Sequence, residues 1–222
     1  MQFKTIHSVK DPHYNEALAL YDSKLDISLT EDKSIFKRSL ENNKTENDYV
    51  FVVGLEDNHV VSLATAHYEA TTNSAFLIYL IAKNLPHHDD LMTATLAQVE
   101  NELNTLSNIV HSRNINFLMM EVPKEPFDLT KDHNQVIEDR RQFLYEHQFE
   151  RQNDIDYIHP NYTFDDQAKE VDLFIKTNIE LTKDIYGASI KSNYILKYVF
   201  ANGISRDIIY PILEAMDLRK PF

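Results

Sequence analysis

Two apolar runs separated by one long amphipathic stretch constrain the fold of this chain more than any other feature. The runs are Ala75–Ala82 and Asn116–Val122, and each has the length and apolar content of a strand buried on both faces. Between them, apolar residues recur at steps of four and three, which is the spacing of one helix face. These residues are Met92, Leu96, Val99, Leu103 and Leu106. Because a helical crossover joins parallel strands, we expect the two runs to lie parallel in one sheet.

The residues before this unit predict an antiparallel meander of three strands. Tyr49–Leu55 and Val60–Glu69 have the composition and alternation of strands, and the polar residues 56–59 between them form a hairpin turn. A second turn at Thr71–Ser74 leads into Ala75–Ala82, which becomes the third strand of the meander. The third strand therefore has an antiparallel neighbour on one side and a parallel neighbour on the other.

The N-terminal residues predict one strand and two helices. Phe3–Val9 reads as a short strand, and apolar residues at helical spacing follow from Pro12 to Leu25. Ser28 and Glu31 have the spacing of a capping box, which predicts that a second helix begins there.

After the second apolar run, the pattern returns to a helix and then to strands. Helical spacing extends from about Asn134 to Phe149, and strands are expected near Tyr157 and at Val171–Thr177. The complete predicted order is β, α, α, β, β, β, α, β, α, β, β. We expect residues 1–177 to form one α/β domain in the α+β sense, with a mixed, mainly antiparallel sheet flanked by helices.

Residues 178–222 form a predicted helical extension. Ser189–Asn202 is rich in apolar and aromatic residues at helical spacing, and Gly203 follows as a typical helix terminator. Ser205 begins a further helix, which Pro211 is expected to shorten or kink. This much apolar surface has to be covered, so the extension packs on its own domain or forms a homodimer interface. We expect it to contribute to both.

Composition excludes several classes of function. The net charge is −13 and no cluster of Lys or Arg exceeds two adjacent residues, which argues against a nucleic-acid partner. The chain has no cysteine, which excludes disulfides, thiolate metal sites and a cysteine nucleophile. The longest apolar run falls well short of the roughly 20 residues that span a bilayer. With no recognisable signal peptide, the expected location is cytoplasmic and no membrane partner is expected.

The histidines do not form a recognisable metal motif. No two of the 10 histidines are three or four residues apart, which is the spacing of paired ligands on one helix. The one dense cluster is His87-His88-Asp89-Asp90, where adjacent side chains on a loop tend to point apart. We therefore predict no metal site.

Several local segments, in this order, resemble the GNAT superfamily of N-acetyltransferases. The strand Leu118-Met119-Met120-Glu121-Val122 is similar to a family strand, and Arg140, Phe143 and Phe149 match a family helix. Tyr157-Ile158-His159-Pro160 and the last strand, Val171–Thr177, complete the resemblance. It implies the GNAT fold over residues 1–177 and acetyl-CoA as a co-substrate. It also implies transfer of an acetyl group to a small amine or amino group.

The resemblance also implies a donor site between the two parallel strands. Pantetheine would bond to the backbone at Leu80, Ile81 and Ala82. The family's pyrophosphate loop corresponds here to residues 87–92. The candidate cofactor-binding residues in that loop are His87, His88, Asp90, Leu91 and Met92, and Arg140 is a further candidate on the following helix. In this loop Asp90 and Met92 replace the family's glycines, while Asp89 or Asp90 is expected to cap the helix.

The candidate catalytic residues are Glu121, Glu69 and Tyr145. Glu121, Glu69 or water could take the proton of the amine, and for Glu121 the alternative is an ion pair with Arg140 or Arg141. The family's general acid is a tyrosine at the position of Leu144 here. Tyr145 is one residue further on, where a helix turns the side chain by about 100°. It is therefore either a shifted acid or a surface tyrosine.

Two functions remain open from the sequence. The first is an active acetyl-CoA-dependent N-acetyltransferase. The second is a GNAT-fold protein without catalysis, which acts as a binding or oligomeric module.

Overall fold

A computed structural model describes residues 1–23, 32–42, 48–124, 131–160, 171–180 and 182–220. Its centre is one mixed sheet with the strand order β1-β2-β3-β4-β5-β7-β6. All neighbouring strands pair antiparallel except β4 and β5, which pair parallel. The predicted fold class and the parallel crossover are confirmed.

The elements follow the predicted order of strands and helices. The strands are β1 (Gln2–Thr5), β2 (Tyr49–Glu56), β3 (His59–Glu69), β4 (Ser74–Ala82), β5 (Phe117–Pro123), β6 (Glu150–Arg151) and β7 (Val171–Thr177). The helices of the domain are α1 (Tyr14–Asp22), α2 (Ser34–Leu40), α3 (His88–His111) and α4 (Lys131–Glu146). The extension forms α5 (Lys183–Tyr194), the π-helix η1 (Ile195–Ala201) and α6 (Arg206–Ala215).

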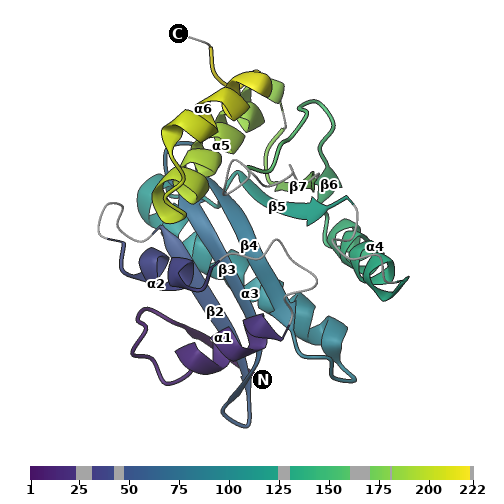
Figure 1. Ribbon diagram of the computed structural model, residues 1–222. Helices are drawn as coiled ribbons and strands as arrows, with labels where there is room; N and C mark the ends of the chain where they lie inside the picture. The colour runs from purple at the N-terminus through teal and green to yellow at the C-terminus, as the bar shows by residue number, and fades with distance from the viewer. Residues whose placement is uncertain (24–31, 43–47, 125–130, 161–170, 181, 221–222) are drawn as a thin grey trace.

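The helices cover the two faces of the sheet in separate layers. Alternate residues of each strand point to opposite faces, so Val50 and Val52 of β2 belong to the layer under α3, whereas Phe51 and Val53 contact α1 and α2. In Figure 1, α3 lies behind the sheet, while α1, α2, α5 and α6 lie in front of it. The extension therefore shares its face of the sheet with the N-terminal helices.

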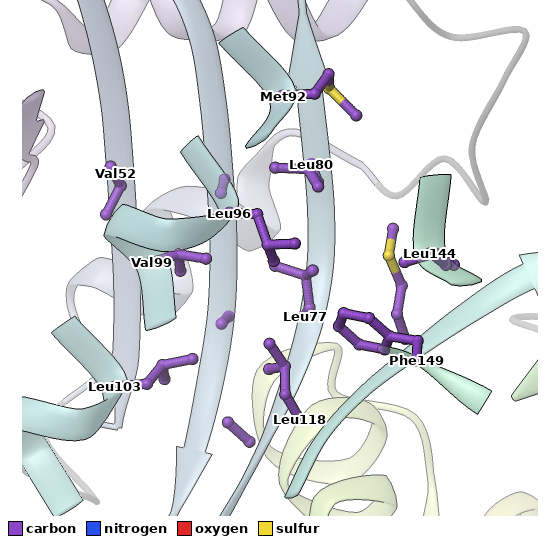
Figure 2. Close-up of a cluster of buried hydrophobic side chains, with 14 of the residues drawn as sticks. Val52, Leu77, Leu80, Met92, Leu96, Val99, Leu103, Leu118, Leu144 and Phe149 are labelled. Carbon is purple, nitrogen blue, oxygen red and sulfur yellow. The ribbon is translucent and has the colours of Figure 1, made fainter. Parts of the chain in front are cut away.

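The layer between α3 and the sheet is the largest apolar cluster, and it includes side chains from α4. Figure 2 shows Leu96, Val99 and Leu103 of α3 in front of the strands, with Phe149 beside Leu77 and Leu118, and Leu144 of α4 beyond Phe149. These side chains are almost entirely shielded from solvent. The apolar stripe that the sequence predicts for α3 is thus the stripe that faces the sheet.

The sheet forks between β4 and β5. The two strands are paired only at their beginnings, where Ser74–Phe76 lie beside Phe117–Met119. Beyond this point β4 follows β3 as far as Ala82, and β5 follows β7 as far as Pro123. Figure 1 shows β5 turning away from β4. A bulge that leaves Ile78 unpaired lies just past the fork, because Leu77 pairs with Ala66 and Tyr79 with Thr65.

The extension packs on its own domain. Buried residues of α5, η1 and α6 form one cluster with Phe76, Phe117, Met119, Leu173 and Ile175 of the sheet. Arg38 of α2 also donates hydrogen bonds to the carbonyl oxygens of Ala201 and Asn202 at the end of η1. Homodimer formation through the extension and the division of the chain at residue 177 both stay predictions.

One expectation about the extension needs correction. Its first helical segment begins at Lys183 rather than Ser189, and its second half is a π-helix before Gly203 takes a φ of 74°. Pro211 lies in the middle of α6 and the helix runs on to Ala215, while a kink at Pro211 stays a prediction. The missing N–H of Pro211 removes one hydrogen bond within the helix, and Ile209 and Leu213 bury the helix against the sheet.

Two expectations about the domain are also wrong. Tyr157 lies in an irregular segment, and the strand that pairs with β7 is the two-residue β6. Neither Asp89 nor Asp90 caps α3: the N-cap position is His87 and makes no side-chain cap bond, while both aspartates lie in the first turn. Leu25 and the predicted capping pair Ser28 and Glu31 lie outside the described residues.

Within the described ranges, no helix combines the length and the apolar character needed to cross a membrane.

Candidate functional site

The mouth of the fork forms a cavity of about 660 Å³ between the end of β4, the start of α3 and one face of α4. Six of the nine predicted cofactor-binding residues line it: Leu80, Ile81, Ala82, His88, Met92 and Arg140. The position of the cavity follows from the divergence of β4 and β5, which leaves one edge of β4 without a strand neighbour.

The exposed edge of β4 offers backbone hydrogen-bonding groups to the cavity. Leu80 accepts a hydrogen bond through its carbonyl oxygen from Nη2 of Arg140, at 3.1 Å. In an extended strand the N–H and C=O of one residue point to the same side, so the N–H of Leu80 faces the cavity as well. A ligand with a secondary amide could pair with this edge as another strand would.

The charges around the cavity are mixed. Carboxylates of Asp89, Asp139 and Glu146 line it together with the guanidinium of Arg140. Burial lowers the pKa of Arg140 to about 10, so this group keeps its positive charge at neutral pH. On the wall formed by α4, the rings of Phe143 and His147 stack at 4.0 Å.

The other three predicted cofactor-binding residues do not line the cavity. His87 places its Nε2 atom 2.9 Å from Oε1 of Glu56. Asp90 is exposed on the first turn of α3, and Leu91 is buried in the core beneath that helix. Of the two aspartates in the first turn of α3, only Asp89 therefore lines the cavity.

Glu121 lies on the opposite face of the sheet, at the centre of a buried polar cluster. Its Oε1 atom accepts hydrogen bonds from the hydroxyl groups of Tyr157 and Tyr198, both at 2.6 Å. Its Oε2 atom lies 3.0 Å from Nζ of Lys197 and 3.1 Å from Nδ1 of His159. The side chains of Glu121 and Lys197 are only 3% and 4% exposed. We call Glu121, Tyr157, His159, Lys197 and Tyr198 the Glu121 cluster.

The Glu121 cluster joins the two branches of the fork through the extension. Glu121 belongs to β5, two residues past the last pair with β4. The Nζ atom of Lys197 also lies 4.7 Å from the ring centroid of Phe76 on β4. Lys197 and Tyr198 both come from the π-helix η1, where two consecutive side chains turn toward the sheet. Such π-helical segments are often found at functional sites.

Electrostatics keeps Glu121 ionised. Burial alone would raise the pKa of this carboxyl group, but the positive charge of Lys197 and the contacts with His159 and Tyr157 outweigh it and hold the pKa well below the ordinary value. Neither Arg140 nor Arg141 is its partner, since Arg140 bonds to Leu80 and Arg141 pairs with Glu138 and Asp172. The predicted ion pair exists, but with a different cation.

The remaining catalytic candidates lie away from the cavity. Tyr145 is 50% exposed and packs edge-on against Phe174, while Leu144 is fully buried in the core. Glu69 accepts hydrogen bonds from the backbone of Thr71 and Thr72 in the turn before β4. It lines a different cavity, of about 610 Å³, at the other end of β4.

His67 is a second buried titratable group under the extension. It pairs with Phe76 across β3 and β4, is 2% exposed, and makes no hydrogen bond of normal geometry through either ring nitrogen. Burial lowers its pKa to about 3, with a further contribution from the charge of Lys197 against a smaller opposing effect of the Asp48 backbone. The native protein therefore holds this ring neutral.

We expect His67 to make the fold sensitive to mild acid. Between pH 6.5 and about 3 the unfolded chain binds a proton at His67 that the native state does not. The free energy of unfolding should therefore fall as pH falls, by up to about 1.4 kcal/mol per pH unit. Urea denaturation at pH 6.5 and at pH 5.0 measures this decrease. Between these two pH values, the free energy of unfolding of His67→Phe should fall by about 2 kcal/mol less than that of the wild type. Equal losses in both proteins would contradict this assignment.

The Glu121 cluster contains residues that the sequence does not single out. Lys197 is the lone charge in the apolar run Tyr194–Ala201. A single lysine in such a run is the available signal, because a buried ammonium needs a carboxylate partner. Within the described part of the chain, no group of three or more acidic or histidine side chains is arranged to hold a metal ion.

Comparisons with solved structures identify the fold. No family model matches the sequence, and a search of curated proteins also finds no match. A GNAT-family acetyltransferase from Bacteroides thetaiotaomicron superposes with a TM-score of 0.57 at 15% identity, over 90% of this chain and 99% of that one. A probable acetyltransferase from Staphylococcus epidermidis gives 0.55 at 12%, over 80% and 99%.

An aminoglycoside 6′-N-acetyltransferase from Enterococcus faecium gives a TM-score of 0.54 at 12% identity, over 82% of this chain and all of that one. At these identities the comparisons establish the fold alone. The chain has the fold of the GNAT acetyltransferases, as its sequence motifs predict.

Proposed function

We propose that this protein is an acetyl-CoA-dependent N-acetyltransferase that acts on a small amine or amino group. The observation that carries the proposal is the forked sheet, in which the β4 edge at Leu80 has no strand neighbour and faces a cavity of about 660 Å³. An extended donor with amides in its arm matches that edge. One of the solved proteins with this fold acetylates an aminoglycoside, which supports an amino group as the acceptor.

The cavity suits the pantetheine arm of the donor better than its diphosphate. Leu80 offers both an N–H and a carbonyl oxygen, and Met92 and Phe143 supply apolar walls. The first turn of α3, where an anion would meet free N–H groups, carries Asp89 and Asp90 and lacks glycine. Binding of the diphosphate then depends on Arg140, the arginine of the cavity.

The chemistry of the reaction requires few groups from the protein. The nitrogen of a neutral amine attacks the thioester carbon, the C–N bond forms, the C–S bond breaks, and one proton leaves the nitrogen while the sulfur gains one. Glu121 is saturated by four contacts and held ionised, and Glu69 is committed to a turn, so we assign the amine proton to water. In this proposal Glu121 fixes the extension to the fork.

A thiol assay tests the proposal directly. Because the chain contains no cysteine, a thiol reagent detects released coenzyme A without a background from the protein. Acetyl-CoA with a panel of primary amines should release thiol at a rate that depends on the amine. Binding of coenzyme A without any amine-dependent release would overturn catalysis and leave the protein as a binding module.

One observation favours that second function. The position of the family's general acid is Leu144, which is fully buried among apolar side chains rather than open to the cavity. This packing is consistent with a GNAT-fold protein that binds a ligand in the cleft but does not catalyse its reaction.

The carboxylate of Asp89 is expected to weaken donor binding. In Asp89→Asn the repulsion between this carboxylate and the donor phosphates disappears, and the affinity for coenzyme A should rise by about two- to tenfold. Asp90→Asn is the matched control, because it removes a charge from the same turn but does not line the cavity. Calorimetric titration measures both. An equal rise in the two variants would show that the effect comes from the helix end and not from the cavity.

A further inference from the structure

Arg140 spans the mouth of the cavity. It comes from α4, on the β5 side of the fork, and its guanidinium reaches the carbonyl oxygen of Leu80 on β4 at 3.1 Å. Among the described residues that line the cavity, Arg140 is the only lysine or arginine. The hydrogen bond therefore links the two walls of the cleft through the one group that carries a fixed positive charge.

The position of this bond creates a competition. The carbonyl oxygen of Leu80 belongs to the free edge of β4, where a donor with an amide arm would pair. A secondary amide of the arm can donate its N–H to this carbonyl only where the guanidinium leaves room. Once displaced, the guanidinium remains inside the cavity and needs a new acceptor, because a buried cation without a partner is costly.

The ligand has to supply that acceptor. A guanidinium binds phosphate oxygens through two parallel hydrogen bonds, which are stronger than a bond to a neutral carbonyl. The carboxylates of the cavity are weaker alternatives, since Asp89, Asp139 and Glu146 are all exposed to solvent. A phosphate on the donor arm is therefore the stronger hydrogen-bond acceptor for the displaced guanidinium of Arg140.

We propose that Arg140 is a displaceable latch that selects donors carrying a phosphate on the pantetheine arm. This inference rests on the proposed function for the identity of the donor. In the free protein Arg140 closes the β4 edge at Leu80. In the bound protein the amide arm occupies that edge and Arg140 holds the phosphate, in place of the glycine-rich loop that this chain lacks.

A series of three ligands separates the two roles of Arg140. Calorimetry with pantetheine, 4′-phosphopantetheine and coenzyme A measures binding to the full chain without any need for turnover. In the wild type we expect 4′-phosphopantetheine to bind about 10- to 100-fold more tightly than pantetheine, which is the range of a hydrogen bond to a charged group. In Arg140→Met this ratio should fall to about one, and pantetheine itself should bind at least as tightly as in the wild type.

Two further variants control for structural effects. Arg141→Met removes the neighbouring arginine, which pairs with Asp172 outside the cavity, and should keep the wild-type ratio. Arg140→Lys keeps the charge but loses the planar pair of donors, and should give an intermediate ratio.

Each outcome decides the proposal. A wild-type ratio near one, an unchanged ratio in Arg140→Met, or equal weakening of pantetheine and phosphopantetheine in that variant would overturn the latch. The last of these results would make Arg140 a structural tie between α4 and β4. If the ratios behave as expected but no amine is acetylated, the proposed catalysis fails while the latch stands. If none of the three ligands binds the wild type, both proposals fall.

Discussion

Lys197→Met should lower the free energy of unfolding by about 3–5 kcal/mol, which is the usual cost of removing one partner from a buried ion pair. The variant keeps the volume and shape of the side chain but leaves the ionised Glu121 without its cation in a site that is 3% exposed. Tyr157 and Tyr198 still donate hydrogen bonds to the carboxylate, yet neutral hydroxyl groups do not replace the charge of the ammonium group. Urea denaturation at neutral pH measures the loss.

A second substitution shows whether charge or packing causes the loss. In Lys197→Met combined with Glu121→Gln, the unpaired charge disappears, and we expect at least half of the lost stability to return. Lys183→Met is the matched control, because it removes an exposed lysine from the same extension and should change stability by less than about 0.5 kcal/mol. A loss below about 1 kcal/mol in Lys197→Met would show that the ion pair does not stabilise the native state.

The same pair gives an independent check through pH. The lowered pKa of Glu121 adds stability above the pKa of the carboxyl in the unfolded chain, and this stability is lost as pH falls through the native pKa. In Lys197→Met the native pKa should rise, because burial then acts with less opposition. Below about pH 4.5, the free energy of unfolding should therefore decrease less steeply with falling pH in the variant than in the wild type. His67 acts from pH 6.5 down to about 3, so only His67 contributes between pH 6.5 and 4.5, and both groups contribute below pH 4.5.

The fold could be predicted because its main elements are encoded locally. The α3 stripe from Met92 to Leu106 and the alternation of β2 and β3 are periodic patterns, and periodicity reports directly which face is buried. The two-residue β6 is too short to have a periodic pattern. It is a strand only because it pairs with β7, so the sequence alone does not reveal it. The motif at Tyr157 looked like a strand because its residues are apolar and aromatic. Tyr157 and Ile158 are instead partly buried against the extension.

The candidate site was predictable only in part, for a different reason. The family resemblance points to Leu80–Ala82 and Arg140, and these residues do line the cavity, while their role in binding a donor stays a prediction. The partner of Glu121 could not be predicted, because Lys197 is distant in the sequence and reaches the carboxylate only through the packing of η1 on the fork. Arg140 and Arg141 are nearer in sequence and face elsewhere. Their contacts depend on the angle between α4 and β5, which no local pattern specifies.

Removal of the extension should abolish the folded state. A chain that ends at Thr177 loses the cover of Phe76, Phe117, Met119, Leu173 and Ile175, all 2% exposed or less in the intact protein. Burial of each such side chain is worth about 1.5–3 kcal/mol, so the five together rival the about 5–15 kcal/mol that holds a whole domain folded. Glu121 loses Lys197 and Tyr198 in the same step. We expect a chain that aggregates and shows no cooperative melting by circular dichroism.

A complementation experiment distinguishes loss of cover from loss of a dimer interface. If the extension acts on its own domain, refolding residues 1–177 with the separate peptide 178–222 should restore a cooperative transition and a one-to-one complex by light scattering. The peptide carrying Lys197→Met should restore it less well, because it brings the apolar cover without the cation for Glu121. A soluble fragment 1–177 that melts cooperatively without the peptide would contradict this role. If the full chain is a dimer and that fragment a folded monomer, the extension would instead serve mainly to join two subunits.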